Sequence, residues 1–167
     1  SKIGASNFGC VAIKTDGTLW SWGRNQFGQV GDGTTTDRSS PVQVGALTTW
    51  SSARGGYGTI LAITTAGTLY AWGYNTNGQL GDGTTTVRSS PVQVGALTTW
   101  SKVGGSGTGM QAIKTDGTLW SWGNAQFGMN GLGNLTTYSS PVQVGALTTW
   151  FKIATGVNNY QMLATQR

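Results

Sequence analysis

The string SSPVQVGALTTW occurs three times in the chain, at residues 39–50, 89–100 and 139–150. A second segment repeats at the same spacing, as GTLWSWG at 17–23 and 117–123 and as GTLYAWG at 67–73. A strict period of about 50 residues is typical of repeat architectures, in which each copy packs against its neighbours. We therefore interpret the chain as one array. Its repeats are residues 1–50, 51–100 and 101–150, with a partial repeat at 151–167.

Glycine is abundant in this chain, and charged residues are scarce. The 167 residues include 28 Gly and 8 Trp, and only 9% of them are charged. Gly, Ser and Thr separate short apolar runs, and no stretch shows the sustained apolar spacing of a helix. This composition favours an all-β fold of short strands joined by tight turns.

One copy indicates how its strands are connected. In VAIKTDGTLWSW, at residues 11–22, two β-prone runs flank Asp16-Gly17. This dipeptide is typical of a two-residue hairpin turn in which both residues have positive φ. The predicted pairs on a bulky face of the hairpin are Ile13 with Trp20 and Val11 with Trp22. The predicted slim face holds Ala12, Lys14, Leu19 and Ser21.

The rest of each copy adds two further strands. A glycine-rich loop at 23–33 leads to the short strand Pro41-Val42-Gln43-Val44, and a fourth run follows at 51–54. Four strands in each copy, repeated in tandem, predict the blades of a β-propeller. A β-solenoid is the alternative, although its coils are usually shorter and lack such hairpins.

The segment GGYGTILAITTAGTLYAWGYNTNGQLGDG, at residues 55–83, resembles the regulator of chromosome condensation repeat family. The likeness extends through all three copies. It implies a propeller, usually of about seven blades. The functions that it implies are guanine-nucleotide exchange with chromatin binding, ultraviolet sensing by clustered Trp, and β-lactamase inhibition. We do not expect nucleotide exchange, because the even spacing of the copies leaves no room for the protruding loop that it would need.

The number of copies raises a problem of closure. Propellers usually have about four to eight blades, and this chain supplies three blades and part of a fourth. Two chains together would carry roughly seven blades. We therefore expect the partner of this chain to be a second copy, in a homodimer that closes a ring, or the rest of a longer parent chain.

Charge and composition argue against several functions. The net charge is +5, but the basic residues are scattered along the chain, so we expect no nucleic-acid binding. No apolar run is long enough to cross a bilayer, so we expect no membrane insertion. The chain contains no His, no Glu and a single Cys, Cys10. We expect no catalytic residues, no metal and no cofactor, and thus a protein that is not an enzyme.

Differences between the copies suggest where a ligand binds. The copies diverge at 24–27, 74–77 and 124–127 and in the glycine-rich stretches at 54–60 and 104–110. Loops on a rigid scaffold commonly carry binding contacts. The candidate binding residues are Arg24, Phe27, Tyr57, Tyr74, Asn75, Asn77 and Phe127.

Two functional hypotheses follow from this pattern. The first is a non-enzymatic β-propeller module that presents its loop surfaces to a protein or glycan partner. The second is a structural or adhesive component of a cell surface or virion, or an engineered symmetric scaffold, as the near-identity of the copies suggests. Low charge and an abundance of Thr, Gly and Ser favour an extracellular or surface location.

Overall fold

The computed structural model describes residues 2–6, 9–155 and 162–166. Within these residues the chain is all-β, as predicted, with one short 3-10 helix, η1 (Gln126–Gly128). Blade 1 consists of β1 (Lys2–Ser6), β2 (Gly9–Ile13), β3 (Leu19–Gly23) and β4 (Arg38–Gln43). Blade 2 consists of β5 (Trp50–Gly55), β6 (Thr59–Thr64), β7 (Leu69–Gly73) and β8 (Arg88–Gln93). Blade 3 consists of β9 (Trp100–Ser106), β10 (Gly109–Lys114), β11 (Leu119–Gly123) and β12 (Tyr138–Gln143). A partial blade follows, with β13 (Trp150–Thr155) and β14 (Met162–Gln166).

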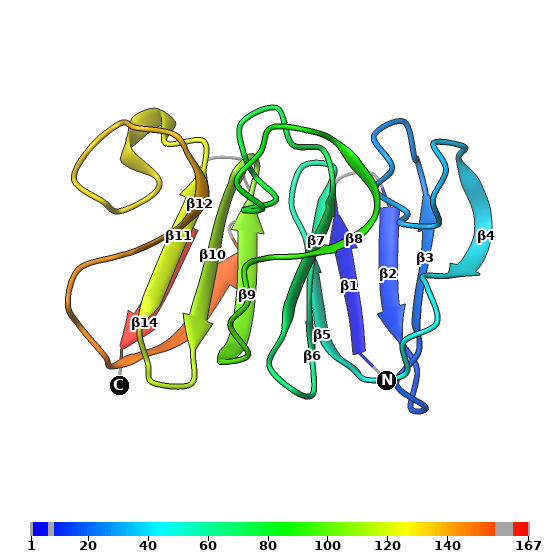
Figure 1. Cartoon of the computed structure of the whole chain (residues 1–167), viewed down its shortest axis with the longest axis horizontal. Helices are drawn as coiled ribbons and strands as arrows, with labels where there is room; N and C mark the ends of the chain where they lie inside the picture. The colour runs from blue at the N-terminus through cyan, green and yellow to red at the C-terminus, as the bar shows by residue number, and fades with distance from the viewer. Residues whose placement is uncertain (1, 7–8, 156–161, 167) are drawn as a thin grey trace.

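The strands of each blade follow one another in order across an antiparallel sheet. The first strands of successive blades, β1, β5, β9 and β13, contact each other in series. Figure 1 shows the three full blades side by side, with the long loops at one end and the tight hairpin turns at the other. This arrangement confirms the predicted propeller-type blades, three complete and one partial. We call the two ends the loop end and the turn end.

The hairpin between β2 and β3 differs from the prediction. The Gly17 N–H donates to the Lys14 carbonyl at 3.1 Å, and the Lys14 N–H donates to the Thr18 carbonyl at 3.0 Å. Gly17 has a φ of 79°, but Asp16 does not have a positive φ. Its carboxylate instead accepts hydrogen bonds from the N–H and hydroxyl of Thr18. This is a three-residue loop closed by a glycine bulge, and the predicted two-residue turn is wrong.

The longer turn moves the strand pairing by one residue. The predicted pairs are Ile13 with Trp20 and Val11 with Trp22, and the observed pairs are Ala12 with Trp20 and Cys10 with Trp22. A shift of one residue exchanges the faces of a strand. Each blade therefore has an aromatic face, on which two aromatic rings lie opposite smaller residues, and an aliphatic face. In blade 1 the aliphatic face carries Val11, Ile13 and Leu19.

The hydrophobic core lies between neighbouring blades. One cluster includes Val11, Ile13 and Leu19 of blade 1 with Ile60, Ala62 and Trp72 of blade 2. A second cluster includes Leu61, Ile63 and Leu69 of blade 2 with Met110, Ala112 and Trp122 of blade 3. The aliphatic face of each blade thus packs against the aromatic face of the next. Trp72 and Trp122 are 0% exposed, which confirms that these repeated Trp residues pack between blades.

Candidate functional site

Three long loops lie together at the loop end of the blades (Figure 1). They follow β3, β7 and β11 and are loop 1 (residues 24–37), loop 2 (residues 74–87) and loop 3 (residues 124–137). Six of the candidate binding residues lie in these loops, and Tyr57 lies in the short turn between β5 and β6. The loop end is therefore the surface on which the copies differ most.

Loop 2 is held in shape by a buried amide. The Asn75 side chain is 0% exposed. Its Nδ2 donates to the carbonyls of Thr84, at 3.1 Å, and Thr86, at 2.9 Å, and its Oδ1 accepts from the Leu80 N–H at 2.9 Å. Asn25 makes the same contacts in loop 1. Asn75 therefore supports the loop from inside and presents no surface to a ligand.

An ion pair fastens the same two loops from the outside. Arg38 Nε donates to Asp32 Oδ2 at 2.6 Å, and Arg88 Nε donates to Asp82 Oδ2 at 3.2 Å. Burial opposes the ionisation of both carboxyl groups. Even so, hydrogen bonds from the threonine two residues further on, together with the guanidinium, hold the pKa of each Asp below its ordinary value. Both carboxylates are therefore charged, and each already accepts hydrogen bonds from residues of its own repeat.

Three candidate residues come together at the junction between blades 1 and 2. The ring centroids of Phe27 and Tyr74 are 4.7 Å apart, and those of Tyr57 and Tyr74 are 6.2 Å apart. Gly58 permits this packing, because a Cβ there would lie 3.3 Å from both Phe27 and Tyr74. All three rings are partly exposed. We call Phe27, Tyr57 and Tyr74 the aromatic cluster.

The remaining candidates lie apart from one another. Arg24 is exposed at the start of loop 1, where its guanidinium donates to the Gln26 side-chain carbonyl. Asn77 is partly buried in loop 2, and its backbone N–H donates to the Gln79 side chain at 2.7 Å. Phe127 lies in η1 of blade 3 with its side chain 75% exposed and a φ of 62°.

The next junction has no counterpart of the aromatic cluster. The positions equivalent to Phe27, Tyr57 and Tyr74 are Asn77, Gly107 and Asn124. Other segments are unchanged between the copies, such as residues 39–50, 89–100 and 139–150. The aromatic cluster is thus a local specialisation of one junction.

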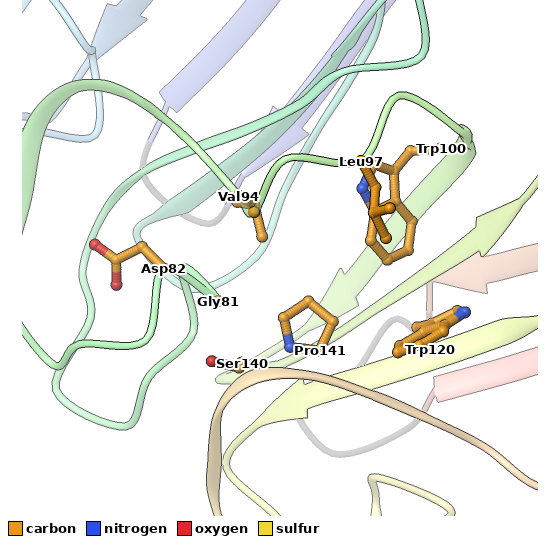
Figure 2. A pocket seen from close by; sticks show the side chains of 9 residues that line it. Gly81, Asp82, Val94, Leu97, Trp100, Trp120, Ser140 and Pro141 are labelled. Atoms are coloured by element: carbon orange, nitrogen blue, oxygen red, sulfur yellow. The ribbon is translucent and has the colours of Figure 1, made fainter.

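An apolar pocket that the sequence analysis did not identify lies between blades 2 and 3. Its volume is about 230 Å³, and Trp100, Trp120, Leu97 and Pro141 are among its lining residues. Figure 2 shows the two indoles, Leu97 and Pro141 on one side of this space and the Asp82 carboxylate directed away from the indoles. The rings of Trp100 and Trp120 meet edge to face, with centroids 6.0 Å apart. The recurrence of Trp at these positions was the available sequence signal.

The described residues include few groups that could bind a metal or react covalently. Among them, no three His, Cys, Asp or Glu side chains gather where they could hold a metal ion. Cys10 is partly buried and free of disulfides. No helix in the described ranges has the length and apolar character needed to span a membrane. The loop end and the apolar pocket offer aromatic and apolar surface for non-covalent binding.

Comparison with protein families finds matches along most of the array. The model of the Regulator of chromosome condensation (RCC1) repeat matches residues 16–63 and 66–109, and a second model of this repeat matches residues 1–29 and 52–79. The ultraviolet-B receptor UVR8 of Arabidopsis thaliana is 56% identical over 34 residues, which is 20% of this chain and 8% of the receptor.

Solved structures share the fold. Human WBSCR16 superposes with a TM-score of 0.85 at 21% identity, covering 100% of this chain and 44% of that protein. Prp20p from Saccharomyces cerevisiae superposes with a TM-score of 0.84 at 20% identity, covering 98% of this chain and 42% of that protein. The chain thus spans less than half the length of these propellers.

Proposed function

Because this chain belongs to the regulator of chromosome condensation repeat family, we propose that it is a non-enzymatic β-propeller module that binds a protein partner. The contact surface in this proposal is the loop end of blades 1 and 2. The aromatic cluster is the observation that carries the proposal, because it gathers three partly exposed rings at one junction only.

The composition of this surface matches that of protein interfaces. Aromatic residues and Arg are enriched at the centre of such interfaces and dominate their binding energy. Phe27, Tyr57 and Tyr74 supply the aromatic area, and Arg24 is exposed on the same loop as Phe27. Each ring adds contact area at a small entropic cost, because it has only two rotatable side-chain bonds.

The loops beneath the cluster are rigidly supported. Asn25 and Asn75 hold loops 1 and 2 through several hydrogen bonds each, and the ion pairs at Asp32 and Asp82 fasten the same loops. A surface that is ordered before binding loses less entropy when a partner docks. This support favours a recognition surface over a loop that orders on contact.

Related structures support a protein partner over a glycan. One solved structure of Prp20p is described together with its binding to Gsp1p and histones, and another shows Kap60 bound to yeast Prp20. We transfer only the class of partner, a protein, to this chain. The array is to be completed by a second copy or by the rest of a longer parent chain.

Binding measurements on matched variants test this function. Proteins captured from the source cells by the immobilised chain would be identified by mass spectrometry, purified and titrated calorimetrically. We expect Tyr74→Ala to weaken binding about tenfold or more, because buried aromatic contacts dominate interface energies. Asn124→Ala, at the equivalent position of blade 3, should change the affinity less than about twofold.

Two results would contradict the proposal. One is a captured protein whose affinity is unchanged by Phe27→Ala, Tyr57→Ala and Tyr74→Ala. The other is binding confined to oligosaccharides on a glycan array, which would make the partner a glycan. Circular dichroism spectra of all variants control for loss of folding.

A further inference from the structure

The turn end of the blades (Figure 1) carries two hollows that resemble each other. One, of about 410 Å³, lies beside the hairpin turn of blade 1, and the other, of about 530 Å³, lies beside that of blade 3. Thr65 of blade 2 also lines the first hollow, so a complete neighbouring blade forms part of its wall. We call them the turn-end hollows. The residues that line them at equivalent positions include Lys14, Asp16, Thr48 and Trp50 in the first and Lys114, Asp116, Thr148 and Trp150 in the second.

The hairpin turn of blade 2 lacks both charged residues. Residues 14–18 and 114–118 read KTDGT, whereas residues 64–68 read TTAGT. Thr64 therefore replaces the Lys of the other two turns, and Ala66 replaces the Asp.

The backbone of the turn is nevertheless the same in blade 2. The Gly67 N–H donates to the Thr64 carbonyl, and the Thr64 N–H donates to the Thr68 carbonyl, both at 3.0 Å. The φ of Gly67 is 79°, as it is at Gly17 and Gly117. The Thr64 hydroxyl accepts from the Thr68 N–H at 3.2 Å and takes the place of the missing carboxylate. The turn thus forms without either charge, and the fold does not explain why the other two blades carry both.

The carboxylate in each turn-end hollow is charged and keeps an oxygen for a ligand. Hydrogen bonds from Thr18 hold the pKa of Asp16 below its ordinary value, and those from Thr118 do the same for Asp116. In both turns the threonine N–H and hydroxyl donate to Oδ1. The Oδ2 atom is therefore the acceptor that a ligand can use.

The ammonium in each turn-end hollow lies over an indole. Lys14 Nζ is 3.8 Å from the centre of the Trp20 ring, and Lys114 Nζ is 3.6 Å from that of Trp120. Lys114 is only 8% exposed, yet its ammonium has no hydrogen-bond acceptor among the described residues. A buried donor of this kind calls for a polar partner.

The mixture of charges limits the chemistry of a ligand. An anion would be repelled by the carboxylate, and a cation would be repelled by the ammonium. Hydroxyl groups of a neutral sugar both donate and accept, so they match the two charges at once. Ile13 and Trp50 add an apolar wall for the C–H face of a sugar ring. Both volumes also fall within the roughly 300–1,000 Å³ of small-molecule sites.

We propose that each turn-end hollow binds one sugar unit of a neutral oligosaccharide. The Lys ammonium donates to one hydroxyl of the sugar, and the Asp Oδ2 accepts from another. Two like sites on one chain favour a polymer of repeating sugar units, because the second contact then forms at a high effective concentration. This binding is separate from the protein contact proposed at the loop end.

Neutral tetrasaccharides of glucose, galactose, mannose and N-acetylglucosamine are the probes. Each is titrated into the full 167-residue chain while the backbone amides are followed by NMR. At least one probe should shift the amides of residues 14–18 and 114–118 and leave those of residues 64–68 in place. Free alanine, a zwitterion that also offers both charges, should shift neither turn.

The turn of blade 2 provides a variant that keeps the fold. Lys14→Thr combined with Asp16→Ala gives blade 1 the turn sequence of blade 2, which forms the same backbone turn. It should weaken sugar binding at blade 1 about tenfold or more, because two charge-assisted hydrogen bonds are lost. The unmodified site at blade 3 is the internal control, and its affinity should change less than about twofold.

Three results would overturn the inference. They are the absence of any amide shift at both turns with all four tetrasaccharides, an equal response of the blade 2 turn, and unchanged affinity at blade 1 in the double variant. A response to alanine in place of the sugars would make the ligand an amino acid and would also overturn it. Tyr74→Ala, at the opposite end of the blades, should leave sugar binding unchanged, so failure of either proposal leaves the other standing. Circular dichroism melts confirm that the variants fold.

Discussion

Replacing Trp72 by Phe tests whether the indole N–H stabilises the junction between the first two blades. Trp72 is 0% exposed, and its Nε1 donates to the Gln29 carbonyl at 3.1 Å. Phenylalanine retains an aromatic ring but leaves this buried carbonyl without its donor, which costs about 1–3 kcal/mol. The smaller ring also leaves a void worth about 1–2 kcal/mol. We expect the free energy of unfolding to fall by about 2–5 kcal/mol in total.

Trp50 provides the control for the lost ring volume. It is 4% exposed, its ring lies 6.2 Å from that of Trp72, and its buried Nε1 has no hydrogen-bond partner among the described residues. Trp50→Phe leaves a similar void but removes a donor that is already unpaired, so it should cost only about 1–2 kcal/mol. The difference between the two variants isolates the hydrogen bond to Gln29.

Urea unfolding followed by circular dichroism measures both costs. The slope of the free energy against urea should be unchanged if each variant unfolds as the parent does. A larger loss for Trp50→Phe than for Trp72→Phe, or an equal loss, would refute the reasoning. It would show that ring volume alone, and not the indole N–H, stabilises the junction.

Three further changes have expected outcomes. Gly28→Ala should cost about 1–3 kcal/mol more than Gly33→Ala in urea unfolding, because both have positive φ but only the first would strike the backbone of the next blade. Equal costs would exclude the close approach as the cause. Asn75→Ala should lower the free energy of unfolding by about 2–4 kcal/mol, because it leaves buried backbone groups of loop 2 unpaired; hydrogen exchange would locate the loss in that loop. The pKa values of Asp32 and Asp82 are lowered in the folded chain. Their ionisation therefore adds stability above about pH 4 that is lost as the pH falls through the folded pKa, and a double Asp→Asn variant should show a shallower acid loss in urea melts between pH 6 and pH 2.

The blades were predictable because their sequence signals are local. Short apolar runs, turn dipeptides and a constant period together specify four strands in each copy. The strand register was not predictable from Asp16-Gly17, because this dipeptide also fits a three-residue loop. The Thr18 hydroxyl and N–H both donate hydrogen bonds to the Asp16 carboxylate, and these bonds favour the longer loop.

The candidate site was predictable in part. Divergence between the copies identified Phe27, Tyr57 and Tyr74, which the structure brings into contact. The same reasoning could not distinguish Asn75, which is buried, from Asn77. The distinguishing signal was the identity of Asn25 and Asn75 across two copies, since a residue that holds a loop together recurs wherever that loop recurs.

The apolar pocket could not be predicted, because it forms by packing of segments that no local sequence pattern brings together. Its walls come from loop 2, from the segment that follows β8, and from strands β9, β11 and β12 of blade 3, so its lining residues are far apart in the chain. Trp100 of β9 and Trp120 of β11 meet there once β9, β10 and β11 form one sheet, because β9 and β11 lie on either side of β10. The sequence shows that these residues recur but not that a hollow forms between them.

Closure of the junctions through main-chain carbonyls and N–H groups has an evolutionary consequence. Gln29 and Ser89 contribute backbone atoms to the first junction, so their side chains can change without loss of the hydrogen bonds. Duplication of one whole copy would create one new boundary with the same partners already in place. Such a protein can lengthen in whole-copy steps while the exposed residues of each copy diverge toward separate tasks.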